Sequence, residues 1–227
     1  MNTGPFGEQP TQAEQLNPEA GNHPVPSDAR ETQAALKAGE ICRNRFPYFE
    51  QRYGVRGRRF TRSDSAWLVT LSRNEPAEIT KQIQWLGRVL SSRGMPTVLL
   101  QTQLEILDEE LTAVIPENKS EYRKLSQAAA QLRASRRTRF SDEQLDTFSA
   151  EFDRAVGPEW SARFPHTGTL LVSAVADDLN GCDGAIKSLR EWMTDAARFP
   201  AEWIAAVETI LAQVHRHASA FQLRSSA

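Results

Sequence analysis

Cysteine is scarce in this chain, and this scarcity limits the kinds of site it can build. Only Cys42 and Cys182 occur, and they lie far apart, outside any Cys-x-x-Cys spacing. The pattern argues against a disulfide framework and against a zinc site made of thiolates. Two free thiols are typical of a reducing compartment. We therefore expect a cytoplasmic protein.

Long apolar runs are also lacking. No stretch reaches the roughly 18 apolar residues that a membrane-spanning helix needs. The first residues, MNTGPFGEQPTQAEQ, contain neither a basic segment nor an apolar core, so they do not have the pattern of a signal peptide. Both observations predict a protein without a membrane partner.

Charge of one sign is not in excess. The 27 Lys and Arg residues nearly balance the 29 Asp and Glu residues, which gives a net charge of −2. A protein that binds nucleic acid through its overall charge is expected to be basic. The balance therefore argues against nucleic acid as the main partner.

Motifs of known chemistry are missing as well. There is no HExxH pair, no glycine-rich phosphate loop and no GxSxG elbow. Among the four histidines, His215 and His217 would point about 200° apart on a helix and could not chelate one metal. The sequence thus predicts no metal site, no cofactor and no catalytic residue, and it favours a non-catalytic protein over an enzyme.

Helix-period patterning is what the sequence has in abundance. The clearest case has apolar residues at spacings of 4, 3, 4 and 3, namely Leu100, Leu104, Leu107, Leu111 and Val114. Prolines and glycines divide the chain into further segments of this kind. We predict an all-α fold of about eight or nine helices, with residues 64–115 as its core.

Local signals place several helix boundaries. Three pairs have the spacing of a capping box: Asp28 with Glu31, Thr61 with Asp64, and Ser141 with Gln144. The run LLVSAV within residues 169–180 has the composition of a buried strand, but a single strand would have no partner. We therefore predict a helix there.

The domain division follows composition. Five prolines within residues 1–27, with little apolar content, predict a disordered tail. Gly157 and Pro158 mark a candidate boundary between a helical core domain at 28–157 and a C-terminal segment at 158–227 that packs on it. A single domain over 28–227 is the alternative.

The most basic stretch is RYGVRGRRFTR at residues 52–62. We interpret it as a loop whose arginines could bind a phosphate or carboxylate. In the favoured interpretation they pair with acidic faces of neighbouring helices, such as Asp108, Glu109 and Glu110. The candidate anion-binding residues are Arg52, Arg56, Arg58, Arg59 and Arg62.

A second basic cluster ends a predicted helix. Cations near a helix C-terminus are favoured by its exposed carbonyl groups, which explains the cluster without a ligand. A protein-binding patch is the alternative. Its residues would be Arg133, Arg136, Arg137 and Arg139. Asp177 and Asp178 lie near the end of a predicted helix, where negative charge is unfavourable. We expect this pair to be compensated by a nearby arginine.

A resemblance adds one further expectation. The segments RYGVRGRRFTRSDSAWL and QWLGRVLSSRGMP resemble the non-haem globin-like sensory domains of bacterial stressosome-type regulators. The resemblance covers about residues 45–115. It implies a globin-like helical domain that senses a signal and contacts partners without chemistry of its own. None of the four histidines has the placement of a haem ligand.

Three functions follow from these observations. The first is a non-catalytic helical regulatory or adaptor module that acts by protein contact or small-ligand sensing. The second is an enzyme or cofactor-binding protein with an arginine-rich pocket for a small anionic ligand. The third and weakest is nucleic-acid binding through the basic loop at 52–62.

Overall fold

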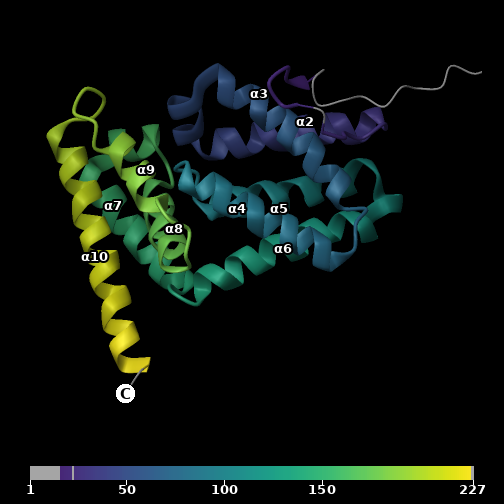
Figure 1. Ribbon diagram of the computed structural model, residues 1–227. Helices are drawn as coiled ribbons and strands as arrows, with labels where there is room; N and C mark the ends of the chain where they lie inside the picture. Colours follow the sequence, from purple (N-terminus) through teal and green to yellow (C-terminus); the bar gives the residue numbers. More distant parts are fainter. Residues whose placement is uncertain (1–15, 22, 226–227) are drawn as a thin grey trace, which may run out of the picture.

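The fold is all-α, as predicted. The computed structural model describes residues 16–21 and 23–225, with side chains up to residue 219. Nine α-helices and one short 3₁₀ turn form this part of the chain, and no β-strand occurs in it (Figure 1). The elements are α2 (Ala29–Arg45), α3 (Pro47–Leu71), α4 (Pro76–Ser92), α5 (Thr97–Val114), η1 (Pro116–Asn118), α6 (Lys119–Arg137), α7 (Asp142–Arg163), α8 (Thr167–Leu179), α9 (Ala185–Met193) and α10 (Ala201–Ser225).

The helices form two groups that share α5. Figure 1 shows α2 and α3 along one side of α4, α5 and α6, with α7 to α10 gathered at one end. Helix α5 packs against α2, α6 and α8, so it belongs to the core of both groups. Every side chain from Thr97 to Leu104 is buried. The strongest periodic signal in the sequence therefore marks the central helix.

The N-terminus of α5 is capped by another helix. Pro96 precedes it and offers no side-chain cap, which leaves buried backbone N–H groups without a helical acceptor. The Asp177 carboxylate of α8 accepts from the Thr97 backbone N–H at 2.8 Å, and Ser173 Oγ accepts from that of Val98 at 3.3 Å. Asp177 of α8 thus caps the N-terminus of α5. The prediction that Asp177 pairs with an arginine is wrong.

Helix α8 carries the run LLVSAV. The prediction of a helix there is confirmed. All residues from Leu170 to Asp177 are buried, so α8 lacks a polar face and resembles a strand in composition. Its burial on several sides explains the ambiguity of the sequence signal.

Residues 52–62 are helical, so the predicted loop is wrong. They belong to α3, which bends at Gly54, where φ is 53° and ψ is −142°. Thr61 does not start a helix, since its hydroxyl donates to the Gly57 carbonyl inside one. The cost of a glycine within a helix is about 1 kcal/mol, and packing outweighs it. A Cβ at Gly57 would lie 2.5 Å from Tyr53 Cβ, so only glycine fits there.

Two other capping signals have different outcomes. The Ser141–Gln144 capping box is confirmed, with both reciprocal hydrogen bonds present. Asp28 caps α2 by accepting from the Arg30 backbone N–H, but Glu31 does not complete a box. Glu31 is instead buried in the interior, where its carboxylate binds other partners.

The packed part of the chain begins before residue 28. Residues 1–15 and 22 of the predicted tail lie outside the described residues. Within the described remainder, Asn17, Ala20 and Val25 are buried, and Asn17 Nδ2 donates to Ser63 Oγ at 3.4 Å. The polar composition of this segment did not reveal that a few of its apolar side chains reach the core.

The boundary predicted at residue 157 falls inside a helix. Helix α7 runs from Asp142 to Arg163 with a bend at Gly157, where φ is 80°. Contacts between α8 and α5 join the segment at 158–227 to the segment before it. None of the described helices is long and apolar enough to cross a membrane.

Candidate ligand-binding cavity

Helices α2, α3, α4 and α5 surround a cavity of about 310 Å³. Four aromatic side chains and several aliphatic side chains of α4 and α5 line it, together with a few polar residues. These residues include Phe46, Phe49, Tyr53, Phe60, Leu86, Leu90 and Leu100. A mostly apolar hollow with a few polar groups is the usual form of a small-molecule site.

The bend at Gly54 shapes one end of the cavity. A φ of 53° is favourable mainly for glycine, and the bend turns residues 47–53 across the helices beneath. Phe49 and Tyr53 of this arm line the cavity. The Tyr53 hydroxyl donates to the Arg93 carbonyl at 2.8 Å, which fixes the arm on the turn between α4 and α5.

Arg52 also holds this arm in place. Its guanidinium donates to the Tyr48 hydroxyl at 2.6 Å and to Ser188 Oγ of α9 at 2.9 Å. It also lies over the Tyr53 ring, 5.2 Å from the ring centroid. Arg52 thus binds groups of the protein itself, and it is not among the residues that line the cavity.

The other predicted anion-binding residues do not converge. Arg56 lines the cavity, and it pairs with Glu19 at 2.8 Å. Arg58 pairs with Glu50 at 3.4 Å. Arg59 and Arg62 are exposed and line no cavity wall. Among the described ion pairs, two of the five arginines therefore have acidic partners, Glu19 and Glu50, and none pairs with residues 108–110.

Two arginines that line the cavity were not among the predicted site residues. Arg43 of α2 and Arg93 of the turn after α4 lie beside the cavity with Arg56. They come from separate parts of the sequence, and neither belongs to a basic cluster. Only the folding of α2 against α4 and α5 brings them together, so no sequence pattern could have indicated them.

Asp64 is the acidic group of the cavity. Ser63 Oγ donates to its carboxylate at 3.4 Å. Burial raises the pKa of Asp64 to about 6, opposed by the Ser63 hydrogen bond and by the charge of His23. Beside it, Gln103 Nε2 donates to Ser65 Oγ at 3.1 Å. The spacing of Thr61 and Asp64 predicts only a capping box, so the position of Asp64 in the cavity wall could not be predicted from it.

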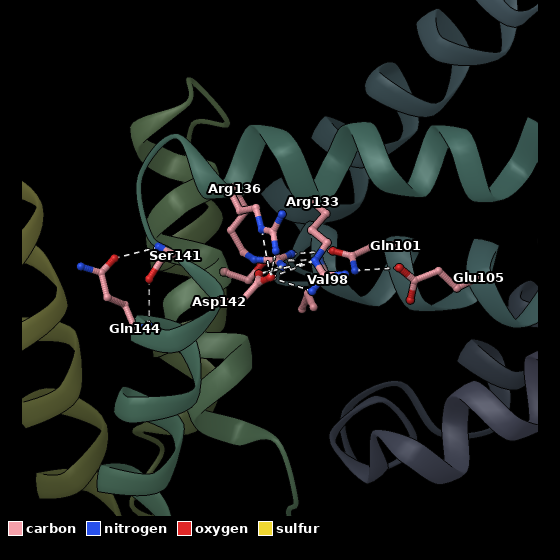
Figure 2. A network of polar contacts seen from close by, with 10 residues as sticks. Val98, Gln101, Glu105, Arg133, Arg136, Ser141, Asp142 and Gln144 are labelled. Carbon is pink, nitrogen blue, oxygen red and sulfur yellow. Dashed lines mark hydrogen bonds and ion pairs between the residues drawn. The ribbon is translucent and has the colours of Figure 1, made fainter.

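The second arginine cluster surrounds one carboxylate (Figure 2). Asp142 at the start of α7 pairs with Arg133 at 2.6 Å, with Arg136 at 3.3 Å and with Arg137. These arginines, chiefly Arg137 through its hydrogen bond, hold the pKa of Asp142 well below its usual range. Arg136 is itself buried and donates to Gln101 Oε1 at 2.5 Å. The cluster therefore joins α6, α7 and α5.

Arg139 completes this cluster with a different partner. It donates to the Leu179 carbonyl at 2.8 Å and to Asn180 Oδ1 at 2.7 Å. The favoured interpretation placed such cations at the C-terminus of their own helix, but Arg139 binds the C-terminal end of α8. Arg133 and Arg137 keep about half of their side chains exposed, and their predicted role in partner binding stays a prediction.

Comparisons with known proteins add no relative. Neither the protein-family models, nor the curated proteins, nor the solved structures gave a match to this chain. The resemblance to globin-like sensory domains therefore stays a prediction. Within the part of the chain that the structure describes, no three His, Cys, Asp or Glu side chains group as metal ligands would.

Proposed function

We propose that this chain is a non-catalytic helical module that binds a small, largely apolar ligand in the cavity between α2, α3, α4 and α5. The single observation that carries the proposal is the cavity of about 310 Å³ with its aromatic wall. Its volume falls within the range of about 300–1,000 Å³ that small-molecule sites occupy, and its mostly apolar wall with a few polar groups is typical of such sites.

The same geometry supports a sensory role of the regulatory kind. Leu86 and Leu90 of α4 line the cavity. On the same helix, Trp85 is 52% exposed, and exposed tryptophans are frequent at protein contacts. Since one helix carries both features, a ligand that shifts α4 would alter the surface presented to a protein partner. We propose such a partner in the cytoplasm, in keeping with the bacterial regulators that the sequence resembles.

A second candidate is the anion-binding site of an enzyme or cofactor-binding protein. It is favoured by the position of Arg43, Arg56 and Arg93 beside one cavity, because guanidinium groups bind carboxylates and phosphates well. Arg56 already has Glu19 as a partner, which reduces its capacity for a ligand. We therefore place this candidate second.

Binding of a neutral apolar probe tests the first proposal. We expect N-phenyl-1-naphthylamine to bind the purified full chain with one site by calorimetry. Leu90→Trp should weaken binding by about tenfold or more, which corresponds to about 1.4 kcal/mol, because the larger side chain enters the cavity.

Leu179→Trp is the matched control. Leu179 is also a partly buried leucine packed against the core, but it lies outside the cavity wall. It should bind the probe like the unaltered chain. Absence of probe binding by the unaltered chain, or equal losses in both variants, would contradict the proposed site.

A further inference from the structure

Glu31 and Asp177 are the buried carboxylates of the described chain, and both have complete sets of partners. Glu31 is 1% exposed and accepts from Arg73 at 2.6 Å and from the Tyr122 hydroxyl at 2.7 Å. A buried carboxylate is costly unless such groups compensate it. Glu31 meets this requirement with one cation and one hydroxyl.

Asp177 meets the requirement without a cation. Its two oxygens accept from Ser91 Oγ at 2.7 Å, from the Thr97 backbone N–H at 2.8 Å and from Thr97 Oγ1 at 2.5 Å. Three donors and a helix N-terminus satisfy this carboxylate. The protein therefore satisfies both of its buried carboxylates from its own groups, whereas Asp64 is partly buried.

Asp64 differs from both. It accepts one long hydrogen bond, from Ser63 at 3.4 Å, and no cation of the described residues lies within 4 Å of it. The neighbouring donors are engaged elsewhere, since the Thr61 hydroxyl donates to Gly57 and the Gln103 amide donates to Ser65. Asp64 lines the cavity, so the missing donor can come only from its occupant or from water.

The rest of the wall suits the same kind of occupant. Phe49, Tyr53 and Phe60 line the cavity with Asp64. Aromatic rings attract cations through the negative charge of their faces, and they offer apolar surface to the remainder of a ligand. An ammonium group beside Asp64 would thus find both a counter-ion and aromatic neighbours.

We propose that the ligand is a monoamine with an apolar, ring-sized body, whose protonated nitrogen donates hydrogen bonds to the Asp64 carboxylate. This inference rests on the proposed function, because it names the ligand class for the same cavity. A second positive charge on the ligand is disfavoured by Arg43, Arg56 and Arg93, which lie beside the cavity. Polyamines are therefore expected to bind more weakly than a monoamine.

Three indole probes of equal shape test the assignment. Tryptamine, tryptophol and indole-3-acetate differ in carrying an ammonium, a hydroxyl and a carboxylate group. At about pH 8, calorimetry should show tryptamine binding at least about tenfold more tightly than the other two. Asp64→Asn should abolish this preference while tryptophol binding changes little. Asp153→Asn, which alters an aspartate outside the cavity wall, should preserve it.

The pH dependence of binding by the unaltered chain gives a second test, which does not depend on whether the Asp64→Asn variant folds. From about pH 8 to pH 5, tryptamine affinity should fall by about tenfold as Asp64 becomes protonated, whereas tryptophol affinity should stay constant. His23 is the other titratable side chain whose charge acts on Asp64. The fall should therefore persist in His23→Gln. Arg43, Arg56 and Arg93 keep their charge throughout.

The outcomes separate the two proposals. Tightest binding of indole-3-acetate would overturn the amine assignment and support the arginine anion site. Equal affinities, or no tryptamine binding by a chain that still binds N-phenyl-1-naphthylamine, would overturn the amine assignment alone. Failure of every probe, the neutral one included, would overturn the cavity as a ligand site.

Discussion

At the scale of single residues, interior aspartates of this protein have opposite roles. Asp177 accepts three hydrogen bonds that fix the start of α5. Asp64 accepts one, and it faces a cavity. Both residues are aspartates within helices with raised pKa values, and burial is the first cause in each case. In our proposal, the number of donors around each carboxylate separates the structural Asp177 from the ligand-binding Asp64.

Removing the Asp64 charge should stabilise the protein at high pH. The folded-state pKa of about 6 lies above the ordinary aspartate value of 3.8, so the folded state binds more protons between these values. The free energy of unfolding therefore falls as pH rises from about 4 through about 6. We expect Asp64→Asn to be more stable than the parent by about 1–2 kcal/mol at about pH 8, and by much less at about pH 4.

Urea denaturation at the two pH values measures this difference. Asp146→Asn, at an exposed position of α7, is the control and should show no comparable gain. A stabilisation of Asp64→Asn that is equal at both pH values would show that the charge of Asp64 is not its cause.

Removing the Asp177 carboxylate should lower the free energy of unfolding. Asp177→Ala leaves the buried Thr97 N–H and two hydroxyls without an acceptor, and unsatisfied buried groups cost about 1–3 kcal/mol each at most. We expect a loss of about 3 kcal/mol in the free energy of unfolding, measured by chemical denaturation. Asp178→Ala, next to it and partly exposed, should lose far less. Similar losses in both variants would contradict the capping role.

At the scale of elements, the bent helix α3 connects packing with the cavity. Its arm at 47–53 is held by Tyr48 and Tyr53, which donate to the carbonyls of Gly94 and Arg93. Glycine at position 54 permits the bend, and aromatic side chains on either side of it line the cavity. Arg58, Arg59 and Arg62 thus lie on the exposed face of this helix, whereas Arg56 and the aromatic side chains line the cavity.

Gly54→Ala tests the importance of this bend. A Cβ at a φ of 53° strains the backbone, so we expect a loss of about 1–2 kcal/mol in stability together with weaker binding of N-phenyl-1-naphthylamine. Gly184→Ala is the matched control, because Gly184 also has a positive φ of 82° and free space around it but lies outside the cavity wall. It should lose stability without losing probe affinity. Probe binding unchanged in Gly54→Ala would show that the arm does not shape the site.

At the scale of the whole molecule, α5 joins the two groups of helices. Its side chains pack against α2, α6 and α8, and its N-terminus depends on Ser173 and Asp177. Arginines at the end of α6 add a second connection through Asp142 and the end of α8. We expect residues 28–157 and 158–225 to unfold together.

The two cysteines report on this cooperativity. Cys42 lies in α2 and Cys182 follows α8, and both thiols are free and buried. In a denaturant series, both should become reactive toward a thiol reagent at the same midpoint. The single variants Cys42→Ser and Cys182→Ser assign each signal. Separate midpoints would support the division into two domains near residue 157.

The sequence by itself determined the secondary structure of this protein. Apolar spacing, Pro76 and Pro96 near helix starts, and Gly94 at a helix end depend only on local backbone and side-chain chemistry, so they could be predicted. The helix at 167–179 was also predicted correctly, because a lone strand has no hydrogen-bonding partner. Where local signals failed, as at Thr61 and Gly57, packing between helices outweighed propensity.

The tertiary structure alone decided where the cavity lies and which charges it contains. Arg43, Asp64 and Arg93 are separated in sequence and come together only when α2 and α3 fold over α4 and α5. Likewise, the donors that satisfy Asp177 lie about 80 residues away in the chain, as the bond to Thr97 shows. Burial and partnership are properties of such distant contacts. For this reason composition could identify arginines as candidates, while only the fold could show that Asp64 has a single hydrogen-bond donor, Ser63.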